Sequence, residues 1–133
     1  MDVTFSEEWW AAFRLAWNTA DEDHSTFGRV SAMRIEVTDA PHESAEIRWD
    51  ATGSIRAISV GGPERLRIPT FKAPQQIWAD FISGKTPVTR LVLHRKIHYE
   101  GPTGFLLSHA VRFELLARIG RLVSAGDAGK SAE

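Results

Sequence analysis

The chain has 133 residues, of which 43% are apolar and 25% are charged, with a net charge of -1 and a sequence pI near 6.5. This length and apolar content are typical of one domain with a substantial core, and a near-neutral charge gives no global field that would gather nucleic acid. There is no cysteine, which excludes disulfides, thiolate nucleophiles and cysteine-based metal centres.

The N-terminal segment MDVTFSEEWW is acidic and lacks the basic and apolar regions of a secretory signal. No apolar run approaches the ~18 residues that are needed to span a bilayer. We therefore expect a cytoplasmic protein without stable membrane insertion.

The chain begins with a predicted helix over residues 6–20. Ser6 is a suitable N-cap, Glu7 and Glu8 follow in the first turn, and apolar residues recur at three- and four-residue spacing. Aromatic rings in this pattern are typical of core packing, and a ligand-lining role is left open for one of them. The residues of the apolar face are Trp9, Trp10, Phe13, Ala16, Trp17 and Ala20.

Period-two alternation then predicts strands over residues 30–38, 43–49 and 54–60, and a fourth strand over residues 66–69 that ends at a proline. Turn-forming segments separate the first three strands, as in hairpins. The apolar residues expected on the inner face of the first two strands are Met33, Ile35, Val37, Ala45, Ile47 and Trp49.

Apolar residues at helical spacing predict a second helix over residues 74–83. Ser83-Gly84-Lys85 ends this helix at a position where a residue free to take positive φ is needed. An apolar segment and a strand over residues 95–100 come next. The predicted order of elements is therefore α-β-β-β-β-α-β-α, once the last helix is included.

The last helix is predicted from Thr103 or Gly104 to about Val123 and is apolar on both sides. One side can pack on the sheet, whereas the other requires a ligand, a partner subunit or a membrane surface; a central helix in an ordinary core is the alternative. Residues 124–133 are small and polar and are expected to form a flexible tail, which leaves residues 1–123 as one domain.

One pattern runs from the second helix to the fifth strand: a helix ending in Ser-Gly-Lys, a proline, an apolar segment and a strand ending in Glu-Gly. Its residues are Ser83, Gly84, Lys85, Pro87, Leu91, Val92, Leu93, Lys96, Ile97, Tyr99, Glu100 and Gly101. This pattern resembles the sterol carrier protein type 2 family of small lipid-binding domains. The resemblance implies an α/β (α+β) fold in which helices cover a single, mainly antiparallel five-stranded sheet around an apolar tunnel.

Two positions depart from the family pattern. Arg95 stands where the family usually has glycine, and Pro102 stands where it often has Asp or Asn. Neither residue takes positive φ readily, so the turn geometry at these positions is expected to differ.

The resemblance also implies non-covalent binding of a hydrophobic ligand, such as a sterol, a fatty acid, an acyl-CoA or a polycyclic metabolite, with no cofactor, metal or catalytic residue. Polar contacts to the ligand are expected from His109 or Arg112, and a homodimer is left open. The expected apolar wall consists of Trp78, Phe81, Ile82, Leu91, Leu93, Phe105, Leu106, Phe113 and Leu116.

Charged residues suggest two further sites. His94, Lys96, His98 and Glu100 would share one face of a strand, and Lys96 between the two histidines disfavours a metal there. The basic cluster of Lys85, Arg90, Arg95 and Lys96 is typical of a solvated surface. The alternative interpretation is a binding site for a phosphate or carboxylate group of a ligand.

Two functions from other classes remain open. In one, the domain is a pathway enzyme in which His109 or Tyr99 acts as acid or base within an apolar pocket. In the other, the last helix is an interface and the protein is an accessory subunit of an assembly.

Overall fold

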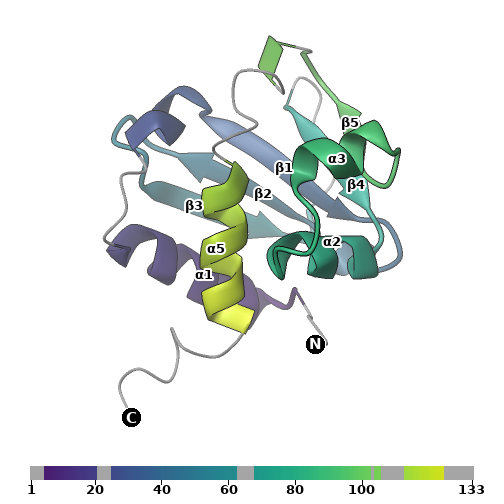
Figure 1. The fold of residues 1–133 in the computed structure, drawn as a ribbon. Helices are drawn as coiled ribbons and strands as arrows, with labels where there is room; N and C mark the ends of the chain where they lie inside the picture. The colour runs from purple at the N-terminus through teal and green to yellow at the C-terminus, as the bar shows by residue number, and fades with distance from the viewer. Residues whose placement is uncertain (1–4, 21–24, 63–67, 103, 106–112, 125–133) are drawn as a thin grey trace.

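A computed structural model describes residues 5–20, 25–62, 68–102, 104–105 and 113–124, in which helices lie against one face of a five-stranded sheet (Figure 1). The helices are α1 (Glu7–Thr19), α2 (Gln75–Ile82), α3 (Val88–Leu93) and α5 (Phe113–Ser124), with short 3-10 helices η1 (Ser25–Arg29) and η2 (Pro41–Glu43). The strands are β1 (Ala32–Val37), β2 (Ala45–Trp49), β3 (Ile55–Val60), β4 (Thr70–Ala73) and β5 (His98–Glu100).

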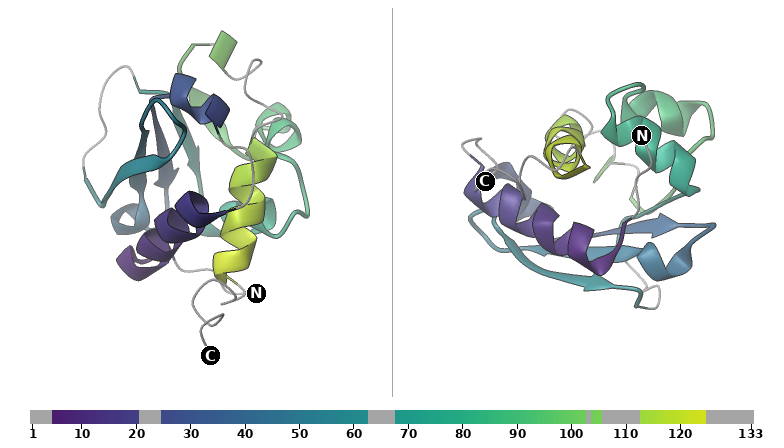
Figure 2. Two further views of the ribbon diagram at one scale, coloured as in Figure 1. Left: turned by 90° about the vertical axis from the view of Figure 1, so that its left-hand side faces the viewer. Right: turned by 90° about the horizontal axis from the view of Figure 1, so that it is seen from below.

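The strand order in the sheet is β3-β2-β1-β4-β5. β1 pairs parallel with β4, while the β1–β2, β2–β3 and β4–β5 pairs are antiparallel. The sheet is therefore mixed and mainly antiparallel, and the predicted fold class is confirmed. Viewed from below, the sheet curves beneath α1, α2 and α5, which lie on its concave side (Figure 2).

The two faces of the sheet differ in polarity, as the alternation predicts. Met33, Val37 and Ile47 are buried on the face that the helices cover. The opposite face carries ion pairs, in which each partly buried charge has a partner of opposite sign. Without such a partner, removing the charge from water would cost free energy. These pairs are Arg34–Glu36 at 3.4 Å, Arg48–Glu46 at 2.6 Å and Lys72–Glu100 at 3.3 Å.

Helix α1 begins as predicted, because the Ser6 side chain accepts a hydrogen bond from the Trp9 backbone N–H at 3.1 Å. Its buried indoles also tie the helix to the sheet. Trp10 Nε1 donates to the Glu43 carbonyl at 2.9 Å, and Trp17 Nε1 donates to the Gly53 carbonyl at 2.8 Å. The helix is thus held at two points along its length by bonds that an ordinary apolar face would lack.

The strand predicted to end at Pro69 is not formed at its described residues, Ile68 and Pro69. β4 begins at Thr70, directly after Pro69, and residues 63–67 lie outside the described ranges. Pro69 precedes the strand, where its missing N–H costs nothing, and its carbonyl accepts a hydrogen bond from Arg34 N at 2.9 Å. The proline therefore marks the start of a strand instead of its end.

The fifth strand is also shorter than predicted, because residues 94–97 complete the end of α3. Lys96 N donates to Leu91 O at 2.8 Å and Arg95 N donates to Val92 O at 3.0 Å, the paired bonds of a Schellman motif. Arg95 takes φ 60° at the left-handed position of this motif. The expectation of a different turn geometry is therefore wrong: the arginine adopts the conformation that glycine would take.

The Ser-Gly-Lys sequence ends α2 as predicted. Gly84 has φ 80°, and Lys85 N donates to Asp80 O at 3.0 Å. Arg121 of α5 reaches over this turn, and its Nε donates to the Ile82 carbonyl at 3.0 Å. A Cβ at Gly84 would collide with the Arg121 guanidinium, so the glycine serves both the turn and the contact between helices.

Gly84→Ala is expected to lower the free energy of unfolding by roughly 2.5–5 kcal/mol. A left-handed alanine costs ~1–2 kcal/mol, and displacement of Arg121 breaks a charged hydrogen bond worth ~1.5–3 kcal/mol. Gly104→Ala is the control, because no described heavy atom lies within 4 Å of its Cβ position. Urea unfolding measures both, and equal midpoints would contradict the double role of Gly84.

The strain at Arg95 can be isolated by comparing two variants at that position. Arg95→Gly and Arg95→Ala both remove the charge, but only glycine relieves the left-handed backbone. We expect the glycine variant to be more stable than the alanine variant by about 1 kcal/mol in urea unfolding. A more stable alanine variant would show that the turn has a different conformation in solution.

Candidate functional site

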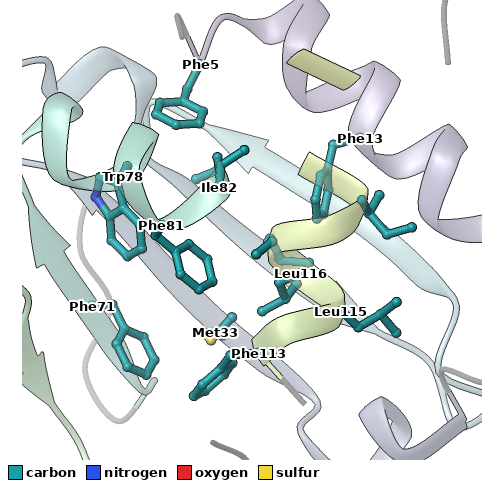
Figure 3. Packing of buried hydrophobic residues seen from close by; sticks show 14 of the residues in the cluster. Phe5, Phe13, Met33, Phe71, Trp78, Phe81, Ile82, Phe113, Leu115 and Leu116 are labelled. Atoms are coloured by element: carbon teal, nitrogen blue, oxygen red, sulfur yellow. The ribbon is translucent and has the colours of Figure 1, made fainter. Parts of the chain in front are cut away.

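The apolar interior between the sheet, α2 and α5 is the candidate site, and we call it the apolar seam. In Figure 3, Trp78 and Phe81 extend from α2 toward Phe113 and Leu116 of α5, above β1 and β4. The edge of the Phe113 ring meets Phe71, with ring centroids 5.2 Å apart. The residues of the seam are Met33, Ile35, Phe71, Trp78, Phe81, Ile82, Phe113 and Leu116.

Two small gaps remain in this packing. One has a volume of about 10 Å³ and lies near Met33, Phe71 and Phe113. The other has a volume of about 20 Å³ and extends to Phe5 and the aromatic face of α1. Each holds at most about one water molecule, so no continuous tunnel is present among the described residues.

Four side chains line both gaps and therefore separate them: Ile35, Trp78, Phe81 and Leu116. We call these four the partition. Trp78 is fixed by a hydrogen bond from its Nε1 to the Glu36 carbonyl at 3.0 Å. The other three are aliphatic or phenyl side chains held by packing alone, so a change of their rotamers would break no side-chain hydrogen bond.

The ends of the helices around the seam are held more firmly. The N-terminus of α2 is bound through Gln75, whose backbone N–H donates to Asp39 Oδ1 at 2.8 Å. The C-terminal end of α5 is bound through Ser124, whose Oγ accepts from Trp9 Nε1 at 3.1 Å. The contact between Arg121 and the Ile82 carbonyl joins the two helices. The seam is thus framed by polar contacts and filled by apolar ones.

Five predicted wall residues lie in the seam: Trp78, Phe81, Ile82, Phe113 and Leu116. Leu91 is buried but lines neither gap, and Phe105 is half-buried beside Tyr99, with ring centroids 6.4 Å apart. Leu106, His109 and Arg112 lie outside the described residues.

Leu93 is the clear departure from the predicted wall, because 79% of its surface is exposed. Leu91 and Val92 turn toward the core in the helical geometry of α3, which leaves Leu93 on the outer side. The sequence predicts an apolar segment here and no helix. In an extended strand Leu91 and Leu93 would have shared one face.

Several wall residues were missed in the sequence. Met33 and Ile35 were expected on the inner face of a strand but not as part of the wall, and Phe71 was placed outside any strand. The signal for Phe71 is the alternation of residues 70–73, in which Phe71 and Ala73 are buried and Lys72 is less so. The aromatic face of α1 lines the second gap through Trp9, Trp10 and Phe13, and a ligand-lining role for one of these rings stays a prediction.

A larger groove of about 440 Å³ lies outside this interior, between α1 and the edge strand β3. Its lining mixes apolar residues with Glu7, Arg14 and Asn18. Arg14 and Asn18 already bind the free edge of β3: Arg14 Nη2 donates to the Arg56 carbonyl at 2.7 Å, and Asn18 Oδ1 accepts from Ile55 N at 2.7 Å. The groove is therefore a surface feature of mixed polarity, and it shares only Trp10 with the lining of the second gap.

Of the two residues considered for acid–base chemistry, the structure describes Tyr99, whereas His109 lies outside the described residues. Tyr99 Oη donates to the Pro102 carbonyl at 2.6 Å, and burial raises the pKa of Tyr99, so its phenol stays protonated at neutral pH and is already engaged. Gly101 permits this contact, since a Cβ there would lie 2.6 Å from that oxygen.

The predicted His/Lys/His/Glu strand face is only partly formed. His94 ends α3, whereas His98 Nε2 lies 3.1 Å from Glu100 Oε2 within β5. A hydrogen bond from Lys72 lowers the pKa of Glu100, so this carboxylate is ionised and already paired. The described residues contain no group of three or more side chains suited to hold a metal ion.

Comparison with solved structures identifies the fold. Sterol carrier protein 2 superposes with a TM-score of 0.71 at 15% identity, over 90% of this chain and 98% of that chain. A conserved hypothetical protein of Thermus thermophilus gives 0.65 at 14%, over 93% and 92%, and the ubiquinone synthesis protein UbiJ-SCP2 gives 0.55 at 13%, over 83% and 90%. The chain therefore has the sterol carrier protein 2 fold, as its Ser-Gly-Lys and Glu-Gly motifs predicted.

The sequence itself matches no family model and no curated protein. At identities of this size the likeness establishes the fold alone. Among the helices that the structure describes, none combines the length and apolar character required to cross a membrane.

Phe113→Ala is expected to lower the free energy of unfolding by ~3–5 kcal/mol, the usual cost of removing a packed phenylalanine. The reason is that Phe113 is only 2% exposed and borders a gap of about 10 Å³, not an open cavity. Leu122→Ala on the same helix is the control, because that leucine is 46% exposed and should change stability by about 0.5 kcal/mol or less. A similarly small effect at Phe113 in urea unfolding would instead indicate an open, ligand-accessible wall.

Proposed function

We propose that this protein binds one large apolar molecule non-covalently in the apolar seam. The observation that carries the proposal is the pair of gaps divided by the partition. Two neighbouring dry spaces with shared apolar walls need only side-chain movement to become one pocket. Ligand pockets are commonly apolar cavities with few polar groups, and the seam has that composition.

The solved structures with the same fold support the class of ligand. Two of them are described as sterol carrier protein 2 and as a ubiquinone synthesis protein, and both descriptions concern lipid-like molecules. By analogy of fold, the ligand proposed here is a sterol, a fatty acid, an acyl-CoA or a polycyclic metabolite. In this proposal, the tunnel implied by the family resemblance forms only when the ligand is bound.

Binding requires the seam to open. Pockets for molecules of this size have volumes of ~300–1,000 Å³, far above the gaps of about 10 and 20 Å³ in the described residues. Phe81 and Leu116 are the side chains whose movement joins the gaps at the lowest cost, because neither makes a hydrogen bond through its side chain. Release of apolar surface from water, at about 25 cal/mol per Å², supplies the driving force.

Leu116→Trp should abolish the binding of a fluorescent fatty-acyl probe, because an indole at this position fills both gaps. Leu122→Trp is the matched control on the exposed side of the same helix and should bind as the wild type does. Thermal unfolding with and without probe measures both, since a ligand at ~100 times its Kd adds about 2.7 kcal/mol of stability.

A second variant keeps the test informative if Leu116→Trp does not fold. Phe81→Ala removes one of the four side chains of the partition and should bind the probe at least as tightly as the wild type, although the free protein is less stable. Native mass spectrometry of freshly purified protein then identifies the bound molecule. Wild-type protein that shows neither a shift in melting temperature nor a co-purified lipid would refute the proposal.

A further inference from the structure

The end of α3 carries a cluster of exposed residues that we call the α3 tip. Its apolar member is Leu93, which is 79% exposed, the largest exposure of any large apolar side chain in the described ranges. α3 lies at the periphery of the molecule, beside α2 (Figure 1). The residues of the α3 tip are Arg90, Leu93, His94, Arg95 and Lys96.

Helix geometry directs these side chains to one side. Leu91 faces the core with 5% exposure, so positions 90, 93 and 94, which are three and four residues apart, share the outward face. Arg95 and Lys96 continue from the same end of the helix. An exposed leucine is thus surrounded by basic side chains, whereas an isolated surface leucine would need no explanation.

Positive charge is concentrated in this part of the chain. Residues 85–99 contain four Lys or Arg residues and no Asp or Glu, although the whole chain has a net charge of -1. Within the part of the chain that the structure describes, Arg90, Arg95 and Lys96 form no ion pair. The remainder of the chain therefore has a net negative charge. A negatively charged surface attracts residues 85–99 and repels the rest.

The backbone of Arg95 provides a second observation. The left-handed conformation at φ 60° costs an arginine ~1–2 kcal/mol, and glycine would fill the position without strain. Such strain tends to occur where a side chain has a function to perform. Here it places a guanidinium at the exposed end of α3, next to Lys96.

We propose that the α3 tip docks on the surface of a bilayer that contains anionic lipids, with Leu93 entering the interface and Arg90, Arg95 and Lys96 contacting lipid phosphates. A bilayer fits better than a small soluble anion, because no residue of the α3 tip lines either gap or the groove. One leucine and three cations give weak, reversible and salt-sensitive binding, as expected for a peripheral protein. The proposal does not depend on ligand binding in the seam.

Vesicle co-sedimentation tests the proposal with the intact chain. We expect binding to vesicles of phosphatidylcholine with phosphatidylglycerol, and weaker or no binding to phosphatidylcholine alone. Arg95→Gly combined with Lys96→Gln should lower the partition coefficient about 30-fold, since each basic residue near an anionic surface contributes about 1 kcal/mol. Arg95→Lys, which retains the charge, should bind as the wild type does.

The apolar contact has its own matched pair of variants. Leu93→Ser should weaken binding about tenfold by removing a side chain that is buried at the interface. Leu15→Ser is the control, because Leu15 is 62% exposed on α1, away from the α3 tip, and its loss should have no effect. Melting temperatures confirm that each variant is folded.

A label reports the orientation directly, because the chain has no cysteine. A polarity-sensitive fluorophore on Leu93→Cys should shift to the blue with anionic vesicles and lose that shift near 1 M salt, where the Debye length falls to ~3 Å. The same label on Leu15→Cys should not respond.

Three outcomes would overturn the proposal. They are equal binding to neutral and anionic vesicles, equal losses for Leu93→Ser and Leu15→Ser, and displacement from vesicles by glycerol 3-phosphate at constant ionic strength. The last result would identify a site for a soluble anion.

Discussion

The parallel pairing of β1 with β4 determines where the walls of the apolar seam stand. It sets Ile35 opposite Phe71 in the register of the sheet and leads the chain from Ala73 directly into α2. Trp78 can then bind the Glu36 carbonyl on β1, which fixes the helix across the strand beneath it. Because one strand supplies both the floor of the seam and the anchor of α2, a shift of β4 by one residue would turn Phe71 to the polar face and remove the wall.

Sequence patterns predicted what depends on local interactions. The start of α1, the end of α2 and the inner faces of β1 and β2 follow from capping, positive φ and alternation, which involve neighbours in the chain. The fourth strand and the outward direction of Leu93 were mistaken, because the first depends on pairing with β1 and the second on a six-residue helix too short to show a period. Wall residues from distant elements, such as Phe5 and Phe71, become neighbours only through the sheet.

Two glycines explain in physical terms why the motifs have their sequences. Gly84 ends α2 and leaves room for Arg121 of α5, so the Ser-Gly-Lys motif also reflects a contact with a residue 37 positions further along the chain. Gly101 lets the Tyr99 hydroxyl reach Pro102 beside Pro69. Arg95 shows the converse, because the turn that usually needs glycine forms with arginine at a cost in strain.

For the binding that we propose, the closed packing of the seam favours large ligands over small ones. Moving Phe81 and Leu116 out of the core costs ~1.5–3 kcal/mol for each side chain, and association costs at least ~4 kcal/mol of lost motion. A ligand that buries about 500 Å² of apolar surface gains about 12 kcal/mol and exceeds the sum of these costs, whereas one that buries about 200 Å² gains only about 5 kcal/mol and does not. An interior that packs fully without the proposed ligand would thus discriminate by size, although the described residues of the seam carry no group that would recognise one lipid among others.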